Sequence, residues 1–447
     1  MMRDVDPCRG WLRAQWGFAW QRQANKWPPC RGGVSIHILA LMVPVFFGLM
    51  GFAIDLGRLY LAHGELKSAA EAMALAAAAR LIGTEASTSD AIEAARRQVE
   101  SASGFGNRYD FGSLVIGEAN GSLNSEIVDP TFYATPGEAT GEGDTAGGQG
   151  TVGGTAAKHV RVELVGETPI IFWRFLSLGQ EGKVPLRVRA AAGISAPLCT
   201  ACGIEPLAIA PLDASDSVNF GFTFNTRYTF GYFCTGTPIP QPLPNTAGRV
   251  QYLLLNRFND EATVFAEDSQ QLFRAGAQGL PPSSNQARAC FTINAEETLW
   301  ASATALACNA NRVQTAVNNF LCGLATRLDT SNVQGCDSSV AEYESLSALY
   351  QPDTDLNDLE DYTGYTGNTR RILTIPIVDI LNPTGTMVVL GFRQFLLQPA
   401  PNSTGISPND GNGRFIATYL GNVAPLRQGR FGSCGVTSGP GKVVLHR

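Results

Sequence analysis

The hydrophobic pattern of the chain is dominated by one uninterrupted apolar run near its N-terminus. Residues 34–54 (VSIHILALMVPVFFGLMGFAI) hold no charged side chain over 21 positions. At a helical rise of 1.5 Å per residue this run spans ~30 Å, the thickness of the hydrocarbon core of a bilayer. Only a helix satisfies its own backbone polar groups within that core. The pattern predicts a single transmembrane helix over residues 34–54.

Beyond the apolar run the pattern becomes that of an alanine-rich amphipathic helix. One face at helical spacing carries Leu66, Ala69, Ala70 and Met73, continued by Ala77 and Leu81. Such a face suits packing on a sheet or on another alanine-rich helix. We expect the helix to run on from the membrane to about Arg80, before Gly83, as a rod of ~65 Å. A second helix is predicted over about 88–102.

Shorter β-prone pieces follow at 113–119, 126–134, 158–176 and 183–195, and we expect them to form one small sheet. The glycine-rich residues 136–157 lie between the second and third pieces and are predicted to be a flexible surface loop. Residues 55–196 are thus expected to be a helix-plus-sheet module that ends at a hinge at Ala196-Pro197.

Residues 197–447 are predicted to form a β-rich domain with helical insertions. Aromatic residues at even positions from 220 to 232 indicate one face of a hairpin that turns near residues 225–226. That face is either an ordinary core, which the pattern favours, or a platform for a glycan or partner strand. A helix is expected over 295–328, and strands over 370–381, 385–397 and 413–421. The fold class is α+β: a long membrane helix packed on a small sheet, followed by a disulfide-rich, mostly β domain.

Charge indicates the orientation of the chain in the membrane. Residues 1–33 carry six basic and two acidic side chains, whereas the whole chain has a formal net charge of −6, so the remainder is strongly acidic. Positively charged flanks stay in the cytoplasm, and an acidic bulk disfavours nucleic acid as a partner. We therefore expect an inner-membrane protein with a cytoplasmic segment 1–33 and a periplasmic C-terminal part. A cleaved signal peptide is the alternative, but the leader and the apolar run are both too long for one.

The cysteines agree with that orientation. Cys8 and Cys30 precede the span, and an even number follows it: Cys199, Cys202, Cys234, Cys290, Cys308, Cys322, Cys336 and Cys434. In an oxidising periplasm these eight form up to four disulfides, and eight cysteines allow 105 pairings, so the connectivity stays open. All eight lie beyond residue 198, which supports a domain boundary near residue 197.

The charged residues at the outer end of the span have two interpretations. Asp55 and Arg58 lie one helical turn apart, where a carboxylate and a guanidinium pair and mark the depth of the helix in the membrane. Alternatively, with Tyr60, they form a membrane-edge surface that docks a helix of another protein.

The junction of span and rod resembles the N-terminal module of the TadE/TadG-like Flp-pilus assembly proteins of the tight-adherence (Tad) system. The similarity lies in Gly32-Gly33 before the span and in two runs after it, residues 53–60 (AIDLGRLY) and 65–76 (ELKSAAEAMALA). It extends to residues 158–196, with a strand, an apolar turn and a returning strand. Lys67 and Glu71 stand where the family commonly has glutamine and aspartate. Ile38 stands where processed pilins have the glutamate five residues after the cleavage glycine, so the resemblance implies an uncleaved, TadG-type anchor.

Motifs for catalysis or metal binding are weak. Asp213-Ala-Ser215-Asp-Ser217 has the letters of a von Willebrand A metal site but lacks the buried strand before it and the helix after it. Cys199 and Cys202 have redox spacing, yet Gly203 and Pro206 break a following helix, which favours a structural disulfide. The acidic loop 352–364 fails the EF-hand pattern and is expected to be solvated. No enzyme activity, metal or cofactor is expected.

The resemblance implies a membrane-anchored periplasmic component of Flp/Tad pilus assembly that works by protein-protein binding. Its expected partners are other Flp/Tad proteins, the membrane through a single span and, as an open alternative, further copies of itself. One rival is a surface-exposed adhesin or minor pilus subunit. The other is a tethered, von Willebrand A-like metal-dependent binding domain that uses Asp213.

Overall fold

The computed structural model describes most of the chain outside its N-terminal segment. The described residues are 33–100, 115–116, 130–141, 152–170, 172, 183–233, 241–255, 290–297, 315–328, 352–357, 361–383, 385–399, 406–407 and 410–446. The predictions for residues 1–32, for Cys234, Cys308 and Cys336, and for the middle of the glycine-rich loop lie outside them.

A single helix, α1 (Gly33–Ala78), joins the apolar run to the alanine-rich segment without a break. Its 46 residues span ~69 Å at the helical rise per residue, and Pro44 lies within it. The apolar half is exposed, as at Leu39 (68%) and Leu41 (72%). Among the described residues, α1 is the one helix long and apolar enough to cross a membrane. The predicted continuous rod is therefore confirmed, and Gly83 follows it with a positive φ of 80°.

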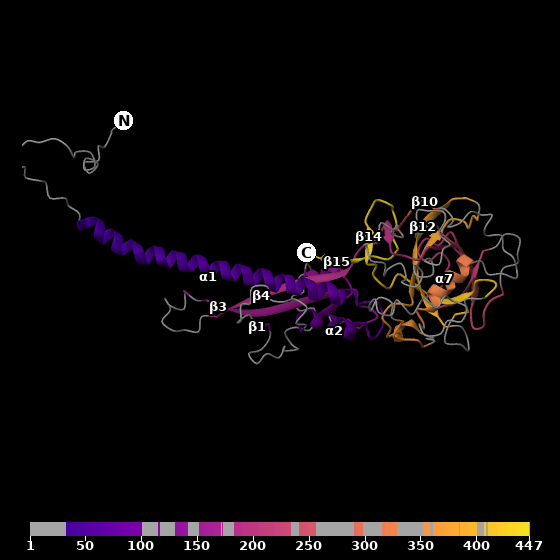
Figure 1. Cartoon of the computed structure of the whole chain (residues 1–447), viewed down its shortest axis with the longest axis horizontal. Coiled ribbons are helices and arrows are strands. Elements are labelled where there is room, and N and C mark those ends of the chain that lie inside the picture. The colour runs from indigo at the N-terminus through magenta and orange to yellow at the C-terminus, as the bar shows by residue number, and fades with distance from the viewer. Residues whose placement is uncertain are drawn as a thin grey trace, which may run out of the picture.

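The second half of α1 packs on a small antiparallel sheet (Figure 1). The sheet has the order β1-β3-β4-β15, and β2 also pairs with β3. Its strands are β1 (Val115–Ile116), β2 (Thr131–Tyr133), β3 (His159–Pro169), β4 (Lys183–Ile194) and β15 (Val443–His446). Helix α2 (Ser87–Glu100) packs on α1, close to the predicted range. All four predicted strand segments contribute to this sheet.

Two features of this module differ from expectation. The glycine-rich segment begins with a short helix, α4 (Pro136–Thr140), in which Ala139 is buried, and it ends with Ala157 buried in the core. Its two ends are therefore anchored rather than flexible. The sheet also takes a strand, β15, from the far end of the chain, where it pairs antiparallel with residues 191–194 of β4. The division of the chain at residue 197 stays a prediction, but the C-terminal residues return across it.

The distal part is built around a closed sheet. The strand order is β10-β12-β11-β6-β8-β7-β13, and the additional pairing of β12 with β13 closes the ring. The strands are β6 (Leu207–Ile209), β7 (Arg227–Tyr232), β8 (Gly248–Leu254), β10 (Glu296–Glu297), β11 (Ile372–Val378), β12 (Met387–Gln398) and β13 (Phe415–Gly421). Helix α7 (Thr315–Ala325) packs against the core through Phe320. The three predicted C-terminal strands are thus confirmed.

Beside this ring lies a three-stranded sheet with the order β14-β5-β9. Its strands are β5 (Thr200–Cys202), β9 (Cys290–Thr292) and β14 (Gln428–Arg430). Disulfides Cys199–Cys434 and Cys202–Cys290 tie these strands together. The two cysteines of the Cys199–Cys202 motif therefore belong to two different bridges. Cys322 is also disulfide-bonded.

The aromatic stripe is core, as the pattern favours. Phe220, Phe222, Tyr228, Phe230 and Tyr232 are all at most 6% exposed. The predicted hairpin is wrong, because β7 pairs in parallel with β8 and antiparallel with β13 rather than with the preceding residues. The aromatic platform is excluded for these five side chains because they face inward. Only the sixth, Phe224, is exposed.

The start of the predicted helix 295–328 is also wrong. Residues 296–297 form β10, which pairs with β12, and among the described residues of this range the helix is confined to α7.

The end of α1 is joined firmly to the distal part. The hydroxyl of Tyr362, in the 3-10 helix η4 (Tyr362–Gly364), donates to the carbonyl of Ile82 at 3.0 Å. The backbone N–H of Glu85 donates to the carbonyl of Thr363 at 2.8 Å. Ile82 and Tyr362 also belong to one buried apolar cluster with Leu420. The segment that follows α1 is therefore tied to the distal part by two hydrogen bonds and by a buried apolar cluster.

Candidate functional site

The membrane edge of α1 is built around a buried carboxylate. Asp55 follows the last residue of the apolar run, and its side chain is 5% exposed. The backbone N–H of Phe172, just beyond the end of β3, donates to Asp55 Oδ2 at 2.9 Å. This contact brings together residues 117 positions apart in sequence. The predicted pairing of Asp55 with Arg58 stays a prediction.

An apolar cavity surrounds this hydrogen bond. Its volume is about 240 Å³, and it is lined by Gly48, Phe52, Asp55, Leu56, Leu59, Ile170 and Phe172. The Phe172 side chain lies directly over Gly51, where a Cβ atom would come within 2.7–2.8 Å of its carbons. Glycine is therefore required at residue 51 for the end of β3 to approach the helix so closely.

The alanine-rich face of α1 is covered within the chain itself. Leu66, Ala69, Ala70 and Met73 are at most 5% exposed and share a core with β3, β4 and α2. The pattern suited packing on a sheet or on a second helix, and the structure has both. These four residues are not available to a partner. Tyr60, which is predicted to form the membrane-edge surface with Asp55 and Arg58, is 79% exposed.

The outer edge of β4 is the second feature of this region. β3 pairs with β4 along its whole length, whereas β15 pairs only with residues 191–194. Among the residues that the structure describes, no strand covers the outer edge of residues 183–190. Unpaired backbone groups at a sheet edge are a template for another strand.

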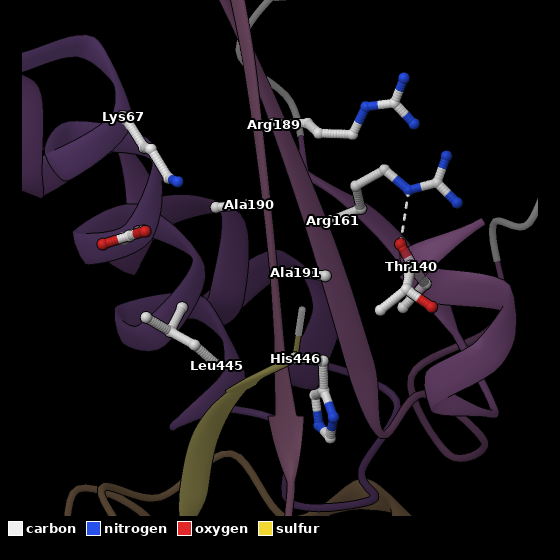
Figure 2. Close-up of a pocket in the computed structure, with 10 residues that line it drawn as sticks. Lys67, Thr140, Arg161, Arg189, Ala190, Ala191, Leu445 and His446 are labelled. Carbon is white, nitrogen blue, oxygen red and sulfur yellow. Dashed lines mark hydrogen bonds between the residues drawn. The ribbon is translucent and has the colours of Figure 1, made fainter. Parts of the chain in front are cut away.

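Two cavities include residues of β4 in their lining. One, of about 310 Å³, has the basic side chains Lys67, Arg161, Arg189 and His446 in its lining, together with the acidic Glu71 (Figure 2). In Figure 2, Arg161 and Arg189 project to the same side of the strands, and Arg161 Nε donates to the carbonyl of Ala139 at 2.8 Å. The other cavity, of about 340 Å³, is lined by His63, Lys67, Glu163, Leu164, Val165, Arg187, Val188 and Arg189. Cations thus outnumber the acidic side chains along the edge.

Two histidines lie where β15 joins the sheet. The rings of His159 and His446 are 5.0 Å apart and nearly perpendicular. Burial, helped by the neighbouring His446 and Lys158, lowers the pKa of His159 to about 4. Burial also lowers the pKa of His446. Both rings are therefore neutral at pH 7.

The distal motifs have structural tasks. Asp213 Oδ1 accepts hydrogen bonds from the backbone and the hydroxyl of Ser215, at 2.9 and 2.6 Å, which form a local turn. These hydrogen bonds lower the pKa of Asp213. Among the described residues, no group of three or more histidine, cysteine or acidic side chains could hold a metal ion.

The acidic loop is solvated only in part, because two of its carboxylates are buried. Asp353 and Asp355 are both 3% exposed, and Asp353 Oδ2 accepts from the hydroxyl of Tyr365 at 2.6 Å and from the backbone of Arg371 at 3.0 Å. Arg371 is fully buried and donates through Nη1 to the carbonyl of Asp355. Asp353 and Asp355 are therefore part of an internal polar network that fastens this part of the loop to β11 and β12.

Sequence reasoning missed the contact of Phe172 with Gly51 and Asp55, and the open edge of β4. The apolar turn after β3 was visible in the sequence, but its position against the helix depends on long-range packing.

Comparison with protein families gives one match. Residues 32–80 match the family described as Flp pilus-assembly TadE/G-like, which confirms the resemblance over that segment. The match covers the apolar run, the membrane edge and the part of α1 that packs on the sheet. Neither a curated protein nor a solved structure matches the chain.

Proposed function

We propose that this protein is a membrane-anchored component of Flp pilus assembly that acts by binding other assembly proteins. Residues 1–33 lie in the cytoplasm, and the sheet and the distal ring lie in the periplasm. The observation that carries the proposal is the continuity of α1: one helix holds the exposed apolar run, forms the core of the folded module and coincides with the family match.

Anchoring follows from the surface of α1. Its apolar half exposes large side chains, such as Phe46 (62%) and Met50 (61%), which are stable only in an apolar medium. An acidic exported part with disulfides agrees with a periplasmic location.

The binding surface that we assign to the partner is the outer edge of β4, residues 183–190. An extended segment of another assembly component adds there as a further strand, since main-chain hydrogen bonds supply affinity at such an edge. Lys67, Arg187 and Arg189 border the edge and favour an acidic segment. Glu163 in the same cavity repels an acidic segment, but it is one carboxylate against the three cations Lys67, Arg187 and Arg189.

Anchoring is tested by deletion of residues 34–54. The shortened protein is expected in the soluble fraction, whereas the full chain sediments with membranes and resists extraction by high salt. A deletion variant that still sediments as an integral membrane protein contradicts the anchor.

Partner binding is tested in cells with a photo-crosslinking amino acid at Arg187. A covalent complex with another assembly component is expected at this position and not at Phe431, a distal residue that is 52% exposed. The double variant Arg187→Glu and Arg189→Glu is expected to reduce pilus formation while the protein level stays unchanged. Equal crosslinking at both positions, or normal pilus formation in the double variant, contradicts the assigned edge.

A further inference from the structure

We propose that the end of β3 enters the outer leaflet of the bilayer beside α1, with the Phe172 side chain in contact with lipid acyl chains. This inference rests on the proposed membrane anchoring. It adds a second membrane contact, made by the folded module itself, to the one made by the helix.

The depth of Phe172 follows from its position along α1. Its side chain lies against Gly51, and Gly51 precedes the end of the apolar run at Ile54 by three residues. At the helical rise, that places the contact ~5 Å on the lipid side of the boundary. Phe172, just beyond the end of β3, thus lies on the lipid side of the level at which α1 emerges from the membrane.

The surface around Phe172 continues the lipid-facing surface of the helix. Phe172 is 40% exposed, and its neighbours Phe52 and Leu56 are 57% and 53% exposed. Apart from Asp55, every residue that lines the cavity between them is apolar or glycine. Since these residues are continuous with the apolar run, the bilayer that surrounds the run also covers them.

The buried carboxylate offsets one cost of this position. A backbone N–H placed in hydrocarbon without an acceptor is strongly destabilising. The N–H of Phe172 donates to Asp55 Oδ2 at 2.9 Å, so this amide is satisfied at the membrane edge. The same hydrogen bond links Phe172 to α1, so Phe172 and this part of α1 lie at the same depth in the membrane.

The experiment uses the full chain reconstituted in vesicles of phosphatidylethanolamine and phosphatidylglycerol. The photo-crosslinker p-benzoylphenylalanine replaces Phe172, Phe46 or Phe431 in separate variants, and lipid adducts are identified by mass spectrometry. Phe46 lies within the apolar run and is 62% exposed, and Phe431 is a distal residue of similar exposure, 52%.

Lipid adducts are expected at positions 46 and 172 and not at 431. Adducts at 46 without adducts at 172 overturn this inference and leave the anchor intact. Absence of adducts at both positions overturns the anchor as well. Adducts of position 172 with protein alone show that a protein surface covers the cavity, which also overturns the inference.

The role of Asp55 is tested in the same assay. Asp55→Leu removes the acceptor and is expected to reduce the lipid adducts at position 172, whereas Asp55→Asn retains an oxygen acceptor and preserves them. Adducts at position 46 serve as the internal reference for correct insertion. Equal adduct yields in the two variants contradict the assignment of Asp55 as the residue that holds the end of β3.

Discussion

The packing of α1 on its sheet makes a quantitative prediction for Leu66→Ala. Leu66 is fully buried in the core that α1 shares with Val160 and Leu164 of β3. Removing three buried carbon groups forfeits ~2.4 kcal/mol of transfer free energy at about 0.8 kcal/mol per group. The cavity left behind raises the expected loss to about 2–5 kcal/mol.

Amide hydrogen exchange in the full chain measures this loss locally. Exchange of the peptide that covers β3 is expected to become at least ~30-fold faster in Leu66→Ala, which corresponds to ~2 kcal/mol. The matched control is Leu61→Ala on the same helix, because Leu61 is 41% exposed and its truncation leaves no internal cavity. If the two variants exchange at the same rate, the sheet is not the packing partner of this face.

Three further predictions concern other parts of the molecule. Replacement of Cys202 and Cys290 by serine opens a bridge that spans 88 residues and is expected to lower the free energy of unfolding by about 2–5 kcal/mol, measured by urea denaturation. The pKa of His159 is about 4 in the folded chain against 6.5 ordinarily, so unfolding takes up a proton between these two pH values. The free energy of unfolding is therefore highest above pH 6.5, and it is expected to fall by about 3 kcal/mol as the pH drops from 6.5 to below 4. His159→Gln is expected to flatten that part of the stability profile, and an unchanged slope would exclude this histidine as its source. Tyr362→Phe leaves the buried carbonyl of Ile82 without its donor, so hydrogen exchange near residues 81–86 is expected to accelerate by an amount equivalent to about 1–3 kcal/mol.

The sequence predicted best those elements whose hydrophobic pattern extends over many consecutive residues. The apolar run and the alanine-rich face specify one continuous helix, and the alternating segments specify β3 and β4, where burial alternates over residues 160–165 and 184–190. The burial of Tyr228, Phe230 and Tyr232 in β7 agrees with the aromatic pattern, whereas Phe220 and Phe222 are buried from a turn before the strand. The family resemblance came from the helix and from residues 158–196, and the family match confirms it over residues 32–80.

The features that sequence did not predict depend on partners far along the chain. Asp353 looked like a solvated carboxylate because its buried partners, Tyr365 and Arg371, come 12 and 18 residues later and belong to another element. β15 is only four residues long, too short for a periodic signal, and it is recognised only by its pairing with β4. Of the candidate site, Asp55 was singled out as a membrane-edge residue, but its bond to Phe172 required the folded sheet.

The return of β15 has a consequence for the order of folding. The sheet packed on α1 incorporates residues 443–446, so its last strand is available only after nearly the entire polypeptide has been synthesised. A chain that stops earlier leaves a longer edge of β4 unpaired, and such an edge invites pairing with other chains. The layer whose helix is made first is therefore among the last to close.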